Sequence, residues 1–148
     1  MNVEIVAAVV GRSDQRLLIG QRRRQDTSPL KWEFPGGKVK PGESLEQALA
    51  RELKEELDAT LLRAVAISRV EHAYGGSLGT LSITFFAASL LESELHPGPF
   101  EQVAWVLPRE LAEFDFLAAN RRLVAELATG RIRPAEILAA AATAPEGR

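Results

Sequence analysis

One amphipathic helix, which begins shortly after a pair of glycines, constrains the fold more than any other feature of the sequence. Leucine recurs every four residues through it, at Leu45, Leu49, Leu53 and Leu57. On a helical wheel that advances about 100° per residue, these side chains span roughly 120° and form one buried stripe. Ser44 precedes the stripe, and Gln47 follows three residues later, which is the spacing of a capping box. The sequence therefore predicts a helix from Ser44 to about Leu57 that packs its leucine face into a core.

Three glutamates lie along the edge of this stripe. With Leu45 at zero on the wheel, Glu56 falls at roughly 20°, inside the apolar face, Glu52 at roughly 340° and Glu55 at roughly 280°. Burial disfavours a charged carboxylate and crowded carboxylates repel one another, so the arrangement needs a cation. Carboxylate oxygens without histidine or cysteine partners favour Mg²⁺ or Mn²⁺ over Zn²⁺. The alternative is a solvated helix face with ordinary i,i+4 ion pairs.

The segment before the helix favours a ligand site over a solvated face. Gly36 and Gly37 allow the backbone to approach a ligand closely, and a glycine carbonyl oxygen can bind a metal. Lys38 follows directly and can pair with phosphate charge. A metal and a phosphate group are therefore candidate ligands of this turn.

The rest of the chain alternates strand and helix patterns, which predicts an α/β or α+β sandwich. Apolar, β-branched runs predict strands at 3–10, 17–19, 65–70, 81–90 and 103–107. Turn-rich residues between these runs predict that the first two strands form one hairpin and that the next two form another, through a turn at 74–79. A loop is predicted at 38–43, a short helix from Pro108 to 114, and a final helix at 117–128.

Size and composition exclude several classes of protein. The 148 residues suit one domain, at 1–133, followed by an alanine-rich tail at 134–148 that is partly helical and frayed at its end. The chain holds no cysteine, which excludes disulfides, thiolate metal sites and cysteine nucleophiles. A net charge of -2 gives no general attraction to a nucleic-acid polymer, and no apolar run approaches the roughly 20 residues of a membrane span. We expect a cytoplasmic protein whose partner is a small molecule.

The glycine turn and the helix together resemble the Nudix box, glycine-x5-glutamate-x7-arginine-glutamate-U-x-glutamate-glutamate-x-glycine-U, where U is aliphatic. This chain matches every charged position of the box; the matching residues are Gly37, Glu43, Arg51, Glu52, Glu55 and Glu56. Asp58 stands where the family has glycine. That glycine closes the helix in a left-handed conformation, which aspartate tolerates, so we expect a modest stability cost and intact chemistry. The resemblance implies the Nudix fold, a mixed β-sheet sandwiched between helices.

The sequence on either side of the box resembles the MutT-type branch of the Nudix family, whose members hydrolyse 8-oxo-dGTP and related triphosphates. The similar segments are 20–22, 32–38 and 114–127. By this resemblance Asn120 contacts the purine edge, Arg22 helps to hold the nucleotide, and Phe34 lines the base pocket. From the residues alone, Asn120 could equally cap the last helix, Arg22 could be solvated, and Phe34 could belong to the core.

The resemblance also implies Mg²⁺-dependent chemistry, with Mn²⁺ as the other suitable ion. The implied metal ligands are the Gly37 carbonyl oxygen, Glu52, Glu55 and Glu56. Arg51 would orient these glutamates and Lys38 would stabilise the phosphates. Glu52 is the first candidate for the general base, and Glu101, in a loop, is a candidate for an extra carboxylate or metal ligand unless it is simply solvated.

The implied reaction yields a nucleoside monophosphate and pyrophosphate and serves nucleotide-pool sanitisation, with a role in DNA repair and replication. Asn120 favours an oxidised purine such as 8-oxo-dGTP, because an amide pairs with both a donor and an acceptor on one base edge. CTP or a modified dCTP is the alternative substrate. A non-catalytic Nudix nucleotide-binding module is the alternative of another class. The sequence leaves the choice between a monomer and a homodimer open.

Overall fold

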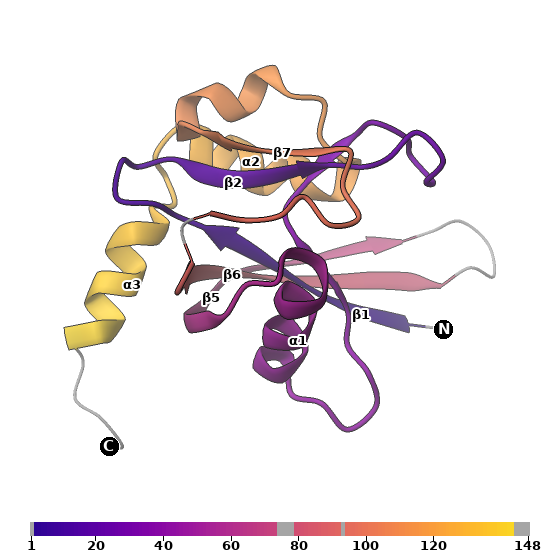
Figure 1. Ribbon diagram of the computed structural model, residues 1–148, viewed down its shortest axis with the longest axis horizontal. Helices are drawn as coiled ribbons and strands as arrows, with labels where there is room; N and C mark the ends of the chain where they lie inside the picture. Colours follow the sequence, from indigo (N-terminus) through magenta and orange to yellow (C-terminus); the bar gives the residue numbers. More distant parts are fainter. Residues whose placement is uncertain (1, 74–78, 93, 144–148) are drawn as a thin grey trace.

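The computed structural model describes residues 2–73, 79–92 and 94–143, and these residues form two β-sheets flanked by helices (Figure 1). The larger sheet has the strand order β4-β1-β6-β5, and the smaller has the order β3-β2-β7. The strands are β1 (Asn2–Val10), β2 (Leu17–Gln21), β3 (Trp32–Glu33), β4 (Gly36–Lys38), β5 (Leu61–Ala73), β6 (Thr80–Leu90) and β7 (Gln102–Val106). The helices are α1 (Leu45–Leu57), α2 (Arg121–Ala128) and α3 (Pro134–Thr143), with the 3₁₀ turns η2 (Pro108–Glu113) and η3 (Ala118–Asn120).

Strand β1 lies inside the larger sheet and contributes to both layers of the core. It runs parallel to β6 and antiparallel to β4. Because side chains alternate along a strand, Ala7 and Val9 face the layer that contains α2, whereas Val6, Ala8 and Val10 face the layer that contains α1. All of these side chains are buried. Helices α1 and α2 therefore cover opposite faces, which confirms the predicted fold class of a mixed sheet between helices.

The first predicted hairpin is wrong, and the second is confirmed. β1 and β2 belong to different sheets, and Gly11, directly after β1, forms an isolated bridge with Leu17. Both edges of β1 are already paired, so β2 pairs with β3 and β7 instead. β5 and β6 form the second hairpin as an antiparallel pair. The turn predicted at 74–79 falls on residues of which 74–78 lie outside the described part of the chain.

The glycines before α1 form a strand and do not end one. Within β4, Gly37 pairs with Val6 of β1 in antiparallel register. Gly36 lies so close to the carbonyl oxygen of Val6 that a Cβ atom would have no room. The loop predicted at 38–43 therefore begins only at Val39, because Lys38 belongs to β4 and the two glycines allow close approach of the two backbones.

Helix α1 begins and ends as its sequence indicates. The Ser44 hydroxyl accepts a hydrogen bond from the Gln47 N–H at 3.1 Å, and the Gln47 side chain accepts one from the Ser44 N–H at 2.9 Å, which forms the predicted capping box. Leu49, Leu53 and Leu57 are fully buried. At the other end Asp58 adopts φ 53° and ψ 39°, the left-handed conformation that was expected of it.

The segment after β7 is built from short helical elements. The turn η2 takes the place of the short helix predicted at 108–114, and η3 followed by α2 takes the place of the helix predicted at 117–128. Helix α3 forms the helical part of the predicted tail and contacts β5 and β6, while residues 144–148 are outside the described range. Whether 134–148 is separate from the 1–133 domain stays a prediction. Within the described ranges, no helix is both long and apolar enough to span a membrane.

The left-handed cap at Asp58 leads to a stability prediction. Glycine adopts φ near 53° without the steric penalty of a side chain, whereas Asp58 offers only an exposed ion pair with Lys54 at 3.0 Å. We expect Asp58→Gly to raise the free energy of unfolding in urea by about 0.5–1 kcal/mol. Asp58→Val, which places a β-branched side chain at the same φ, should lower it by about 1 kcal/mol or more. A glycine variant less stable than the parent protein would contradict the interpretation.

Candidate active site

A pocket of about 440 Å³ lies where β1, β4, β6 and η3 meet. Part of its wall is apolar and is formed by Ile5, Leu81, Ile83 and Phe85. Predicted site residues supply much of the remainder, namely Arg22, Phe34, Gly37, Lys38, Glu56 and Asn120. The pocket thus combines an apolar surface with charged groups and an amide, which suits a ligand that has one flat apolar part and one charged part.

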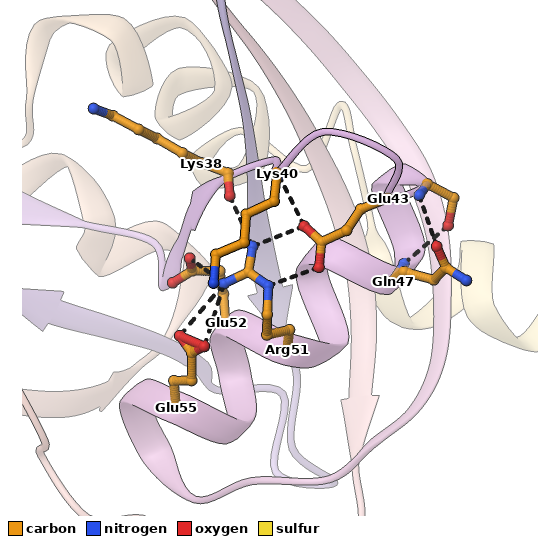
Figure 2. A network of polar contacts seen from close by, with 8 residues as sticks. Lys38, Lys40, Glu43, Gln47, Arg51, Glu52 and Glu55 are labelled. Carbon is orange, nitrogen blue, oxygen red and sulfur yellow. Dashed lines mark hydrogen bonds and ion pairs between the residues drawn. The ribbon is translucent and has the colours of Figure 1, made fainter.

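The guanidinium of Arg51 holds several acidic residues in one network (Figure 2). Its Nε and Nη2 donate to the two carboxylate oxygens of Glu43 at 2.7 and 2.9 Å, a bidentate pair. Its Nη1 donates to Glu52 at 2.8 Å and reaches Glu55 at 3.4 Å, while Nη2 also donates to the Lys38 carbonyl oxygen at 2.9 Å. Hydrogen bonding from Arg51 lowers the pKa of the Glu43 carboxyl to about 2, so this pair is ionised at neutral pH.

Glu56 faces the pocket and lies outside the Arg51 network. Its Oε1 accepts a hydrogen bond from the Gly36 N–H at 3.1 Å. Burial, followed by the charges of Glu52 and Glu33, raises the pKa of Glu56 to about 8. The carboxylate is thus desolvated beside the leucine stripe, as its place on the helical wheel predicts, and a nearby cation would stabilise its charged form.

The Glu52 carboxylate fills the space that a side chain at Gly37 would take. A Cβ atom at Gly37 would collide with the carboxylate carbon and both oxygens of Glu52. In the described part of the chain, no three acidic or histidine side chains converge as a ready metal site, since Glu52 and Glu55 contact Arg51 and Glu56 contacts Gly36. The available donors, carboxylates beside a backbone without a side chain, nevertheless fit a hard divalent cation.

Asn120 and Phe34 form part of the pocket wall together with the core. Asn120 is 5% exposed, and its side chain makes no capping hydrogen bond to α2. The backbone N–H of Asn120 donates a hydrogen bond to the Leu117 carbonyl oxygen. Phe34 is 3% exposed and packs edge-on against Phe85 with ring centroids 6.1 Å apart. The capping alternative for Asn120 therefore finds no support, whereas Phe34 serves core and pocket at once.

Arg22 and Lys38 reach the pocket in different ways. Arg22 is held by other groups, since its Nη1 contacts a Glu33 oxygen at 3.3 Å and its Nε donates to the Thr27 carbonyl oxygen at 2.7 Å. It is therefore an ordered pocket residue and not a solvated one. Lys38 is exposed, and its side chain points away from the Arg51 guanidinium (Figure 2). Its ammonium is thus placed to meet a ligand that enters from solvent.

Glu101 is not brought to this pocket. Its side chain is exposed and does not line the pocket, and its N–H donates to the Gln21 carbonyl oxygen at 2.8 Å. The residue directly precedes β7, so the β2–β7 pairing fixes its backbone. These contacts favour the interpretation of Glu101 as a solvated loop residue over a role as a carboxylate ligand beside α1.

Two titratable residues of the pocket wall, Glu33 and His72, were not predicted from the sequence. Glu33 lies in the wall, where burial raises its pKa and Arg22 counteracts the rise. Its signal in the sequence was a charged residue between Trp32 and Phe34, which are both buried. His72 enters the wall from β5 and gave no comparable signal, because one histidine in a strand that alternates polar and apolar residues is unremarkable.

Comparison of the chain with known proteins identifies its family. Residues 1–127 match the family model described as the NUDIX domain. The chain belongs to the Nudix family. It is 34% identical over 137 residues to the CTP pyrophosphohydrolase of Escherichia coli, a match that covers 90% of this chain and 98% of that protein. It is 29% identical over 125 residues to the 8-oxo-dGTP diphosphatase of Haemophilus influenzae, covering 84% of this chain and 90% of that protein.

Solved structures agree with this assignment. A MutT structure, from work on the Aliivibrio salmonicida and Vibrio cholerae proteins, is 31% identical, with a TM-score of 0.71 over 88% of this chain and 99% of that chain. The predicted family, its MutT-type likeness and the predicted class of enzyme, a Nudix pyrophosphohydrolase, are confirmed. The spacing of the Nudix box agrees with contacts in the fold, because Arg51 in α1 binds Glu43 just before the helix and the Lys38 carbonyl oxygen at the end of β4.

The raised pKa of Glu56 predicts how stability depends on pH when no metal is bound. Because the folded state holds this proton up to about pH 8 and the unfolded state releases it near its ordinary value of 4.5, stability falls as pH rises between these values. We expect Glu56→Gln to remove this fall and to raise Tm at pH 9 by about 5 °C, with little change at pH 4. Thermal unfolding in a chelator tests this.

The neighbouring substitution Glu55→Gln provides the control. Glu55 is on the same helix, and its side chain is 53% exposed, so its removal should leave the pH profile nearly unchanged. Equal Tm values at pH 9 for the parent protein and Glu56→Gln would show that Glu56 is not desolvated.

Proposed function

We propose that this Nudix protein is a metal-dependent pyrophosphohydrolase that cuts a nucleoside triphosphate into a nucleoside monophosphate and pyrophosphate. The observation that carries the proposal is that one pocket contains both the buried carboxyl group of Glu56 and the side-chain amide of Asn120. This amide makes no capping hydrogen bond to α2. The first is suited to metal chemistry and the second to recognition of a base edge. Relatives that are named as an 8-oxo-dGTP diphosphatase and a CTP pyrophosphohydrolase support the same reaction class.

The cofactor in this proposal is Mg²⁺, with Mn²⁺ as a substitute. The residues that would hold it are the Gly37 carbonyl oxygen, Glu52, Glu55 and Glu56. When bound, the ion supplies charge neutralisation at the phosphates and lowers the pKa of a coordinated water. Oxygen donors alone, with no cysteine in the chain, favour this choice over Zn²⁺.

The remaining steps belong to the side chains of the protein. Arg51 orients Glu52 and Glu55 through its hydrogen bonds of 2.8 and 3.4 Å. Lys38 stabilises the phosphates as a charged donor, Arg22 helps to hold the nucleotide, and Glu52 accepts the proton of the attacking water. Glu101 stays a weaker candidate for an extra carboxylate, because its side chain is exposed and does not line the pocket.

The base in this proposal is an oxidised purine such as that of 8-oxo-dGTP. Phe34 and the apolar wall cover the ring faces, and the Asn120 amide pairs with one donor and one acceptor on the purine edge. CTP is the second candidate, favoured by the 34% identity to a CTP pyrophosphohydrolase. The cytoplasmic location, the role in DNA repair and the choice between monomer and homodimer stay predictions.

A pyrophosphate-release assay with Mg²⁺ and a panel of canonical and oxidised triphosphates tests the function. We expect turnover in the parent protein and a loss on the order of 10²-fold or more in Glu56→Gln, because the amide removes a ligand charge. Circular dichroism should report an unchanged fold. Absence of turnover for every nucleotide at mildly alkaline pH would favour a non-catalytic binding module instead.

Base selection is tested separately with Asn120→Ala. This substitution should reduce the preference for the favoured base by about 10-fold or more, measured as a ratio of kcat/KM values between two nucleotides, because a hydrogen-bonded edge is lost. Phosphate chemistry should continue on the remaining substrates. An equal loss for every nucleotide would show that Asn120 has a structural role only.

A further inference from the structure

Three consecutive arginines follow β2, and the structure gives them different surroundings. Arg22 lines the pocket and contacts Glu33. Arg23 is partly buried, and its Nη2 donates to the Gly98 carbonyl oxygen at 2.7 Å, across 75 positions of the sequence. Arg24 is exposed. A run of positive charge that reads as one basic cluster therefore contains one arginine that joins two distant segments.

The backbone of Arg23 is itself fixed. Its N–H donates to the Asp26 carboxylate at 3.1 Å, and its carbonyl oxygen accepts from the Asp26 N–H at 3.2 Å. These two bonds close a tight turn directly after β2. The Arg23 guanidinium therefore extends from a backbone that is fixed by two hydrogen bonds.

Gly98, the acceptor of this bond, packs against the last turn of α1. It has φ 53°, and a Cβ atom there would collide with the carbonyl oxygen of Glu56. The same segment is tied to β2 at two further points, because the Phe100 ring lies against Gly20 and the Glu101 N–H donates to the Gln21 carbonyl oxygen at 2.8 Å. The segment 97–101 therefore bridges β2 and the backbone of Glu56.

We propose that Arg23 is a positioning residue that clamps segment 97–101 against the last turn of α1 and thereby fixes Glu56. This inference rests on the proposed function, in which Glu56 is a metal ligand, and it assigns Arg23 no contact with the substrate. The buried Leu57 and the Gly36 hydrogen bond hold the last turn of α1 from the core side. The contact of Gly98 with the Glu56 carbonyl oxygen holds the same turn from segment 97–101, which Arg23 anchors. Small displacements of a ligand set reduce turnover strongly while binding elsewhere is kept.

Steady-state kinetics of Arg23→Ala, Arg23→Lys and the matched control Arg24→Ala test the proposal. We expect Arg23→Ala to lower kcat by about 10-fold while KM changes by less than about 2-fold. Arg23→Lys, which keeps a donor for the Gly98 carbonyl oxygen, should recover most of the loss, and Arg24→Ala should resemble the parent protein. An increase in KM alone would show that Arg23 binds substrate. Equal losses in Arg23→Ala and Arg24→Ala would show a general effect of positive charge. Both results overturn the proposal.

Amide hydrogen exchange gives a readout that does not depend on activity. In Arg23→Ala the N–H groups of Phe100 and Glu101 should exchange about 10-fold faster than in the parent protein or in Arg24→Ala, because segment 97–101 loses its clamp. Unchanged exchange would overturn the proposal even if the kinetics agreed. A parent protein without turnover would refute the proposed function alone, since the exchange comparison would still decide whether Arg23 holds the segment.

Discussion

The site depends on one electrostatic constraint, which is that several carboxylates lie on and beside the apolar edge of a single helix. Helix α1 must bury its leucines to join the core, and this burial takes water away from Glu56. The Arg51 guanidinium partly offsets the repulsion between carboxylates, because its one positive charge contacts Glu43, Glu52 and Glu55. Glu56 receives only a hydrogen bond from the Gly36 N–H. One positive charge thus serves three carboxylates, and Glu56 remains outside this network with a raised pKa at the pocket.

The parts that the sequence predicted well are those set by short-range spacing. The capping box, the leucine stripe and the left-handed cap at Asp58 lie within one helix and its ends, so their geometry follows from helix periodicity. The match to the Nudix box belongs to the same class, because its charged residues are separated by fixed intervals along a turn and a helix. The family assignment rested on this segment and is confirmed by the match over residues 1–127.

The parts that the sequence did not predict depend on which strands meet. Pairing of β1 with β6, far along the chain, removed the hairpin expected between β1 and β2, and pairing of β1 with β4 extended a strand to Lys38, where a loop was expected. Glu33 and His72 reach the pocket for the same reason, because the walls come from β3 and β5. Local sequence does not indicate which strands pair over long distances. For the same reason the sequence could not predict that Glu101 lies outside the pocket.

The alternation of side chains along β1 bears on two properties of the enzyme, the shape of its pocket and the support of helix α1. Ile5, Val6 and Ala7 all line the pocket, but the Ile5 and Ala7 side chains belong to the core layer of α2, while Val6, Ala8 and Val10 pack under α1. Substitutions at Ile5 or Ala7 therefore change the pocket from the face of β1 that does not support the glutamate helix. Such a division allows substrate preference to diverge among descendants of one ancestor while the hydrolytic helix stays the same. A single strand thus gives the fold a capacity to evolve new specificities without rebuilding its chemistry.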